Sequence, residues 1–254
     1  MTDKLPVALT IAGSDSGGGA GIQADLRAFT KLHTFGTTAI TCITAQNPDE
    51  VRDVQPIEPA LISTQIKTIC DFFPVKAAKT GMLFSEEIIN SVAETLETVE
   101  IKNLVVDPVM VATSGVKLLQ EDAIDALCSK IIPKAMIITP NVPELEILSG
   151  RKINSIDDMK AAAELAGSKY NVAVAAKGGH LNHDDETCLI DILFDNGKFT
   201  EFLGPRLKVN STHGTGCSFA AAMAACLAQG HSLEEAMPIA KDYVADYIRL
   251  QDDQ

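Results

Sequence analysis

The segment Val7-Ala-Leu-Thr-Ile-Ala-Gly-Ser-Asp-Ser-Gly-Gly-Gly-Ala-Gly21 joins a short apolar run to a glycine-rich turn. A helical pattern follows over residues 22–32, and the next apolar run begins at Thr38. Apolar runs of strand length that alternate with helices predict parallel strands buried on both faces. Because this alternation continues along most of the chain, we predict an α/β fold with a central, mainly parallel sheet between two layers of helices.

The same pattern predicts the other elements. Strands are expected at residues 7–12, 38–45, 75–80, 104–107, 136–139 and 172–176, and helices at 22–32, 59–71, 86–98, 121–130 and 157–166. Residues 187–194 and 198–203, joined by Asp195-Asn-Gly197, predict a β-hairpin. Helices over 217–229 and 233–250 then follow. No linker or internal repeat divides residues 1–254, so we expect one domain.

Composition narrows the classes of partner. The net charge of −13 disfavours nucleic acids and acidic membranes, which require basic patches. No apolar run approaches the ~20 residues that span a bilayer, and the first residues do not resemble a signal peptide. The six cysteines show no C-x-x-C pairing, which is typical of buried thiols in a reducing cytoplasm. We therefore expect a cytoplasmic protein with small-molecule ligands.

A second informative stretch is Asn210-Ser-Thr-His-Gly-Thr-Gly-Cys-Ser-Phe219, which runs into an alanine-rich helix. Small residues at 214–216 let backbone N–H groups converge at the helix start, where the helix dipole favours an anion. Cys217 lies in the first turn, where the pKa of a thiol is expected to be lowered, so that it accepts a proton from a nearby hydroxyl. An anion site beside a proton acceptor indicates phosphoryl transfer. Glycines that serve only helix packing are the alternative.

Other unusual residues follow the predicted strands, where ligands bind in parallel sheets. These strand-end segments are residues 13–19, 45–47, 79–82, 107–110, 139–144 and 177–180. The segment Gly19-Ala-Gly-Ile-Gln-Ala24 fits a dinucleotide-binding pattern, but the next strand ends in Gln46 rather than in an acidic residue. No P-loop motif is present. We therefore expect the glycines to let a small ligand approach the backbone.

Two further residue sets favour a nucleotide site. Asn141 and Glu144 share one face of a first helical turn, where their oxygens suit a hydrated Mg²⁺ or, alternatively, form a capping box. Both interpretations remain open. Lys177 ends a buried strand, from which its ammonium group can reach phosphates. The loop over residues 213–216, before the alanine-rich helix, is here called the anion loop. His213 is expected to orient this loop rather than to act in catalysis.

Together these motifs resemble the hydroxymethylpyrimidine/phosphomethylpyrimidine kinases of thiamine biosynthesis, which belong to the ribokinase-like superfamily. The resemblance covers about residues 5–250, and the motifs occur in the family's order. The ending Thr212-His-Gly-Thr-Gly-Cys217 is the most specific, because much of the superfamily has aspartate at the last position.

The resemblance implies a three-layer ribokinase-like fold without a large lid, often as a homodimer. It implies transfer of the ATP γ-phosphoryl group to 4-amino-5-hydroxymethyl-2-methylpyrimidine and then to its monophosphate. The implied cofactors are ATP and Mg²⁺, with a monovalent cation as an open alternative.

The resemblance also assigns residues by matching position. The pyrimidine pocket would be formed by Gly13, Asp25, Gln46, Met82 and Val109. The nucleotide and its phosphates would contact Asp107, Asn141, Lys177, Thr212 and Thr215. Gly214 and Gly216 would form the catalytic anion site, Cys217 would be the base, and Glu144 with Asn141 would hold Mg²⁺ through water.

Two alternatives remain open. Some relatives with the same Gly-Thr-Gly-Cys ending phosphorylate vitamin B6 alcohols, so a pyridoxal kinase is the second hypothesis. A non-catalytic sensor of pyrimidines or nucleotides is the third, although pure binding does not require a proton acceptor beside an anion site.

Overall fold

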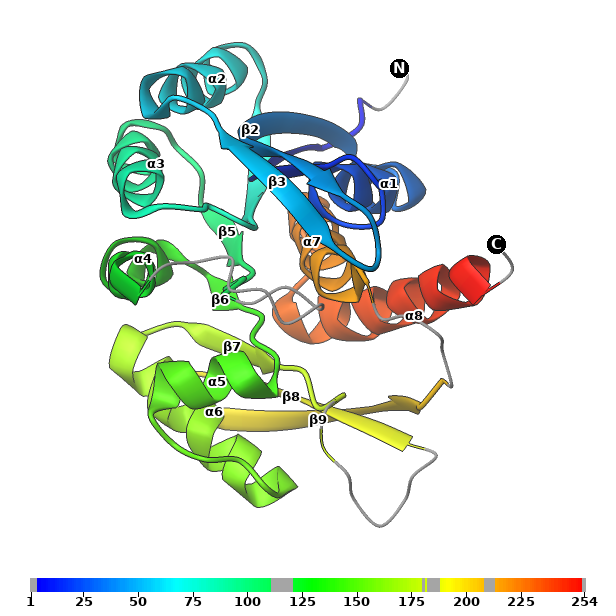
Figure 1. Ribbon diagram of the computed structural model, residues 1–254. Coiled ribbons are helices and arrows are strands. Elements are labelled where there is room, and N and C mark those ends of the chain that lie inside the picture. Colours follow the sequence, from blue (N-terminus) through cyan, green and yellow to red (C-terminus); the bar gives the residue numbers. More distant parts are fainter. Residues whose placement is uncertain (1–3, 111–120, 180, 182–187, 208–212, 253–254) are drawn as a thin grey trace.

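The computed structural model describes residues 4–110, 121–179, 181, 188–207 and 213–252 (Figure 1). Its nine strands form one sheet in the order β3-β2-β1-β4-β5-β6-β7-β8-β9. They are β1 (Val7–Asp15), β2 (Phe35–Gln46), β3 (Val51–Pro56), β4 (Val75–Thr80), β5 (Asn103–Val106), β6 (Ile137–Ile138), β7 (Ala173–Ala176), β8 (Cys188–Asp195) and β9 (Lys198–Pro205).

Six neighbouring strands pair in parallel, namely β2, β1, β4, β5, β6 and β7. This pairing confirms the mainly parallel sheet. Strand β3 pairs antiparallel with β2 at one edge, and β8 and β9 form an antiparallel pair at the other. The turn between β8 and β9 places Asn196 and Gly197 at φ 48° and 78°. Two consecutive left-handed residues are what a tight hairpin turn requires, so the predicted hairpin is confirmed.

The helices form two layers, one on each face of the sheet (Figure 1). Helices α2 to α6 pack on one face, and α1, α7 and α8 on the other. The bounds are α1 (Gly21–Lys31), α2 (Pro59–Phe72), α3 (Glu86–Thr98), α4 (Glu121–Ala126), α5 (Val142–Ser149), α6 (Ile156–Tyr170), α7 (Thr215–Ala228) and α8 (Leu233–Asp252). The predicted three-layer α/β architecture is therefore confirmed.

The structure differs from the sequence prediction in two elements. Strand β3 was not predicted, because the segment Val51-Arg-Asp-Val-Gln-Pro56 has no buried apolar face. It lies at the edge of the sheet, and none of its six residues is buried. The helix expected over 121–130 leaves α-helical geometry after Ala126. It continues as a π-helical turn (Leu127–Ile131) and a 3₁₀ turn (Ile132–Lys134), in which Pro133 lacks a backbone donor.

None of the described helices is long and apolar enough to cross a membrane. All six cysteines are free thiols.

Helix α7 lies between the sheet and helices α1 and α8, so it is buried all round. Every residue from Ser218 to Ala228 is buried, and most of them are alanine. Small side chains let α7 approach the sheet closely, which brings the N-terminus of α7 to the carboxyl ends of the strands. The position of that N-terminus therefore depends on tight packing along the whole helix.

This packing predicts that Ala224→Leu destabilises the protein by about 1–3 kcal/mol, because a fully buried position has no room for the added carbons. Urea unfolding would measure the change. The matched control is Ala60→Leu at an exposed position of α2, where we expect a change within about 0.5 kcal/mol. Equal midpoints for the two variants would contradict tight packing around α7.

Candidate active site

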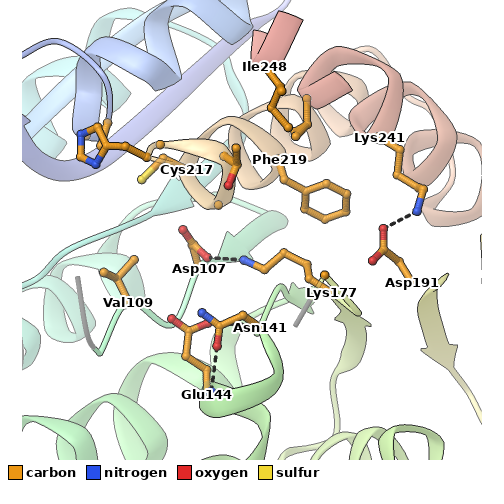
Figure 2. Close-up of a pocket in the computed structure, with 18 of the residues that line it drawn as sticks. Asp107, Val109, Asn141, Glu144, Lys177, Asp191, Cys217, Phe219, Lys241 and Ile248 are labelled. Carbon is orange, nitrogen blue, oxygen red and sulfur yellow. Dashed lines mark hydrogen bonds and ion pairs between the residues drawn. The ribbon is translucent and has the colours of Figure 1, made fainter. Parts of the chain in front are cut away.

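The carboxyl ends of the parallel strands open into a cavity of about 940 Å³ (Figure 2). Its wall brings together twelve of the predicted site residues: Gly13, Gln46, Met82, Asp107, Val109, Asn141, Glu144, Lys177, Gly214, Thr215, Gly216 and Cys217. Thr212 lies outside the described residues. The expectation that the unusual strand ends meet at one edge of the sheet is confirmed.

The two ends of the cavity are formed by different elements of the fold. Residues of β1, β2 and the segment after β4, including Gly13, Gln46 and Met82, form one end. Residues of β9 and α8, including Phe202 and Val244, form the other. In Figure 2 the ion pair of Asp107 with Lys177 lies between Val109 on one side and Ile248 on the other. The start of α7 therefore faces the middle of an elongated cavity.

An ion pair lies below the cavity wall on the face that α7 covers. The ammonium nitrogen of Lys79 on β4 is 2.9 Å and 3.0 Å from the two carboxylate oxygens of Asp25 on α1. The hydroxyl of Thr10 donates to the same carboxylate at 2.6 Å. Burial is the largest influence on the pKa of Lys79 and would lower it, but Asp25 together with Cys217 and Asp107 raises it above its usual value. Lys79 therefore stays charged although its side chain is fully buried.

The expectation that Asp25 lines the pyrimidine pocket is wrong. Its carboxylate is fully buried and its hydrogen bonds go to Lys79 and Thr10, so it does not reach the cavity. Lys79 lines the wall in its place. The sequence showed Lys79 only as part of a strand-end segment, because its partner lies far away along the chain.

A second ion pair occupies the centre of the cavity. Lys177 Nζ lies 3.3 Å from Asp107 Oδ1, and the hydroxyl of Thr139 donates to the same oxygen at 3.2 Å. Burial is the largest influence on the pKa of Lys177 and would lower it, but Asp107 together with Glu144 and Cys217 raises the pKa. A Cβ atom added to Gly216 would lie 3.4 Å from Lys177 Nζ. Glycine therefore leaves the ion pair in close contact with the first turn of α7.

Asn141 and Glu144 form a capping box at the start of α5. The Asn141 side chain accepts from Glu144 N at 2.9 Å, and Glu144 Oε2 accepts from Asn141 N at 2.8 Å. Burial raises the pKa of Glu144 to about 7, although Lys177 opposes the shift. Both hydrogen bonds of the predicted capping box are therefore present. Glu144 also lines the cavity, so the cap does not remove its carboxylate from the site.

The first turn of α7 depends on a glycine at its N-cap. Gly214 has φ 79°, and a Cβ atom there would lie 1.9 Å from the carbonyl oxygen of Gly19. No other residue fits without moving one of the two loops. Cys217 follows three positions later and lines the cavity.

The expectation that the pKa of Cys217 is lowered is wrong. Burial raises the pKa of this thiol to about 11, although Lys79 and the backbone N–H of Gly21 act in the opposite direction. The carboxylates of Asp25 and Asp107 add to the increase. The thiol is therefore protonated at neutral pH in the free protein.

The loop over residues 16–20, here called the glycine loop, is the middle of the glycine-rich turn over residues 13–21. The two ends of this turn line the cavity, with Gly13 and Asp15 at one end and Ala20 and Gly21 at the other. In the middle, a Cβ atom on Gly19 would lie 2.4 Å from the ring of His213. Gly19 therefore serves the packing of the glycine loop against the anion loop. His213 Nε2 lies 3.0 Å from Asp15 Oδ2, which agrees with its expected orienting role.

Gln46 ends β2 at the cavity, as predicted. The Thr44 hydroxyl lies 3.2 Å from its amide oxygen, but the single proton of this hydroxyl also has the nearer carbonyl oxygen of Ser14 at 3.0 Å. The Gln46 amide therefore keeps its oxygen and both N–H groups available to other partners.

Sequence reasoning missed the residues at the other end of the cavity. Lys241 on α8 forms an ion pair with Asp191 on β8 (Figure 2) and donates to the carbonyl of Phe202 at 2.9 Å. Arg206 donates to the carbonyls of Gly179 and Leu181. A lysine in an amphipathic helix carries no sequence signal that would mark it as part of a site.

Comparisons with known proteins agree with the fold. A family model described as phosphomethylpyrimidine kinase matches residues 15–253. The hydroxymethylpyrimidine/phosphomethylpyrimidine kinase of Bacillus subtilis is 42% identical over 241 residues, which cover 95% of this chain and 88% of that protein. The thiamine biosynthesis bifunctional protein ThiED of Geobacter sulfurreducens is 44% identical over 95% of this chain, but this chain spans only 49% of that protein.

Two solved structures are similar throughout. The phosphomethylpyrimidine kinase of Clostridium difficile has a TM-score of 0.85 at 40% identity, covering 96% of this chain and 100% of that one. The pyridoxal kinase of Staphylococcus aureus in complex with pyridoxal has a TM-score of 0.86 at 39% identity, covering 97% and 88%. The family model and the relatives agree over almost the whole chain, and we conclude that it belongs to the ribokinase-like phosphomethylpyrimidine kinase family.

Proposed function

We propose that this kinase transfers the γ-phosphoryl group of ATP to 4-amino-5-hydroxymethyl-2-methylpyrimidine and then to the resulting monophosphate, for thiamine biosynthesis. The observation that carries the proposal is Cys217 in the first turn of α7, in one cavity with Gln46 and Lys177. A thiol beside the N-terminus of a helix would provide a proton acceptor next to an anion site. The relatives from Bacillus subtilis and Haemophilus influenzae are both hydroxymethylpyrimidine/phosphomethylpyrimidine kinases, which supports the same pair of substrates.

The pyrimidine would occupy the end of the cavity near Gln46. Met82 and Val109 supply apolar surface there, and Gly13 leaves room for a flat ring. A Cβ atom on Gly13 would clash with the sulfur of Cys42, at 2.7 Å. The amide of Gln46 would pair with the aminopyrimidine edge, which presents an acceptor beside a donor.

The triphosphate would lie along the centre of the cavity. Lys177 would contact phosphate oxygens, and the backbone N–H groups of residues 214–216, including that of Thr215, would bind the transferred group. Thr212 keeps its predicted phosphate role on the basis of resemblance alone. Apolar residues of α8, such as Val244 and Ile248, would face the base at the far end.

The donor set fits a hydrated Mg²⁺ rather than a cage built by the protein. The described residues contain no group of three or more His, Cys, Asp or Glu side chains placed to hold a metal. The capping bonds engage Asn141 Oδ1 and Glu144 Oε2, so Glu144 and Asp107 would act through water. When bound with the nucleotide, Mg²⁺ neutralises the charge on the phosphate oxygens.

The thiolate of Cys217 would take the proton of the substrate hydroxyl as the oxygen attacks phosphorus and the bond to the ADP leaving group breaks. Because the pKa of Cys217 is raised to about 11 in the free protein, only a small fraction is thiolate at pH 7. At pH values below this pKa, the thiolate fraction increases tenfold for each unit by which the pH rises. The anion site would stabilise the transferring group, so removal of the thiol would slow the reaction without abolishing it.

We expect log kcat/KM to rise with pH with a slope of about one between about pH 7 and 9, because the reactive form is the thiolate. Cys217→Ala should lower kcat by about 10²–10⁴-fold and flatten the profile. Cys217→Asp should recover part of the rate and reach its plateau at lower pH, because a carboxyl group ionises at lower pH than a thiol. Steady-state rates across this pH range measure all three. A flat profile in the unmodified protein would exclude Cys217 as the base.

We expect the Mg²⁺ concentration for half-maximal rate to increase as the pH falls below about 7, because Glu144 is then protonated. Glu144→Gln should raise this concentration and remove its pH dependence in that range. The matched control is Glu146→Gln in the same helix, whose carboxylate pairs with Lys152 at 2.7 Å. If Glu144→Gln has the same Mg²⁺ requirement as the control, Glu144 serves only as a helix cap.

A pyridoxal kinase is the second candidate, and the structural neighbours that bind pyridoxal favour it. Pyridoxal lacks the exocyclic amine of the pyrimidine, so it would leave an acceptor of Gln46 unpaired. Sites built around a polar pair reject such analogues strongly. The experiment that separates the two functions is a comparison of the two alcohols.

We expect kcat/KM for the aminopyrimidine alcohol to exceed that for pyridoxal by at least about 10²-fold. Gln46→Leu should reduce this preference, mainly by weakening use of the pyrimidine. Gln55→Leu on the exposed face of β3 is the control and should leave the preference unchanged. Comparable kcat/KM values in the unmodified protein would favour the pyridoxal kinase.

We further propose that the protein acts as a cytoplasmic homodimer of one domain over residues 1–254, without nucleic-acid or membrane partners. The free thiols and the net charge of −13 support this proposal. A requirement for a monovalent cation stays an open alternative, which rates in potassium and in choline buffers would decide.

A further inference from the structure

Tyr247 on α8 connects the two ends of the cavity. Its hydroxyl donates a hydrogen bond of 2.7 Å to the carbonyl oxygen of Gly19 in the glycine loop. The same carbonyl faces Gly214, whose added Cβ would lie only 1.9 Å from it. A helix, the glycine loop and the N-cap of α7 therefore meet at one backbone oxygen.

Arg27 on α1 strengthens this junction. Its guanidinium group donates to the carbonyl of Gly18 and lies 5.7 Å from the centre of the Tyr247 ring. A cation at this distance from an aromatic face is attracted to it. Tyr247 is therefore held at both its ring and its hydroxyl, and it is 9% exposed.

The inner side of the glycine loop is held by Asp15. Its carboxylate accepts from Gly17 N at 2.8 Å and from Ala20 N at 2.7 Å, and it contacts His213 in the anion loop. Asp15 and Ala20 line the cavity near Gly13. A shift of the glycine loop therefore changes the wall of the end that we assign to the pyrimidine.

Helix α8 also lines the opposite end of the cavity. Lys241, Val244, Ala245 and Ile248 face it, and Ile248 directly follows Tyr247 in the chain (Figure 2). A ligand that packs against this side of α8 holds the same helical turn that carries the Tyr247 hydroxyl. The nucleotide end and the glycine loop are thus joined through one short, rigid segment.

We propose that Tyr247 is a positioning residue that couples the two substrates: nucleotide bound against α8 fixes the glycine loop through the hydrogen bond of Tyr247 to Gly19, and so tightens pyrimidine binding. This inference rests on the proposed function for the assignment of the two ends. Coupling is reciprocal, so the pyrimidine should tighten nucleotide binding by the same factor.

Calorimetric titration of the aminopyrimidine alcohol, with and without saturating Mg²⁺ and the β,γ-methylene analogue of ATP, tests the proposal. In the unmodified protein we expect the analogue to lower the Kd of the pyrimidine by about 5–10-fold, the size that one hydrogen bond supports. Tyr247→Phe keeps the ring and removes only the hydroxyl, so the factor should fall to below about twofold. The Kd of the analogue alone should change by less than about twofold.

The matched control is Tyr243→Phe, one turn earlier on α8. Among the described residues the Tyr243 hydroxyl has no hydrogen bond, and its ring packs against the same core as α7. We expect this variant to retain the full coupling. In steady-state assays Tyr247→Phe should raise KM for the pyrimidine at saturating ATP, with kcat changed by less than about twofold. A general loss of packing would affect both parameters and the thermal midpoint.

Full coupling in Tyr247→Phe, or no coupling in the unmodified protein, would overturn the inference. Equal losses of coupling in the Tyr247 and Tyr243 variants would overturn it as well, because the Gly19 hydrogen bond would not be the cause. Failure of the proposed function has a different signature: pyridoxal, not the pyrimidine, is then bound and phosphorylated. The same titrations with pyridoxal would then measure the coupling, because the glycine loop and α8 are unchanged.

Discussion

Charge matching inside the cavity is the constraint on which the rest of the site depends. Each lysine of the described cavity wall pairs with an aspartate: Lys79 with Asp25, Lys177 with Asp107 and Lys241 with Asp191. Removing one partner of a buried pair leaves an uncompensated charge, which costs about 3–5 kcal/mol. The pairs therefore join α1 to β4, the segment after β5 to the segment after β7, and β8 to α8. They also leave the free site with little uncompensated positive charge, although its natural ligand would be a polyanion.

Under the proposed function, phosphate recognition would then depend on the backbone and on a bound cation more than on free side-chain charge. The N-terminus of α7 suits this task because Gly214 and Gly216 lie where a Cβ would meet the Gly19 carbonyl or the Lys177 ammonium group. The same charge matching explains why the helix N-terminus does not lower the pKa of Cys217: nearby carboxylates oppose Lys79, and burial dominates. A thiol that stays neutral in the free protein is a poor nucleophile towards oxidants, which protects it in the absence of substrate.

The sequence predicted what depends on local pattern, and failed where distant residues decide. Alternating strands and helices, the Asn196–Gly197 turn and the first turn of α7 follow from short segments, and the structure agrees with them. The role of Asp25 on α1 depends on Lys79 on β4, which is far away along the chain. Composition and spacing therefore could not reveal that the carboxylate of Asp25 is paired below the cavity wall. The prediction of a lowered pKa for Cys217 failed for the same reason, because burial and the carboxylates of Asp25 and Asp107, which are distant in the sequence, raise this pKa. Strand β3 carries no apolar pattern and is held by pairing with β2 alone.

Similarity of fold does not choose between the two alcohols. A phosphomethylpyrimidine kinase and a pyridoxal kinase match this chain with TM-scores of 0.85 and 0.86. Under the proposed function, selectivity would come from the end of the cavity formed by β1, β2 and the segment after β4. There the Gln46 amide presents a donor beside an acceptor. A polar pair would discriminate through the group that a wrong ligand lacks, whereas the apolar surface of Met82 and Val109 would accept either ring.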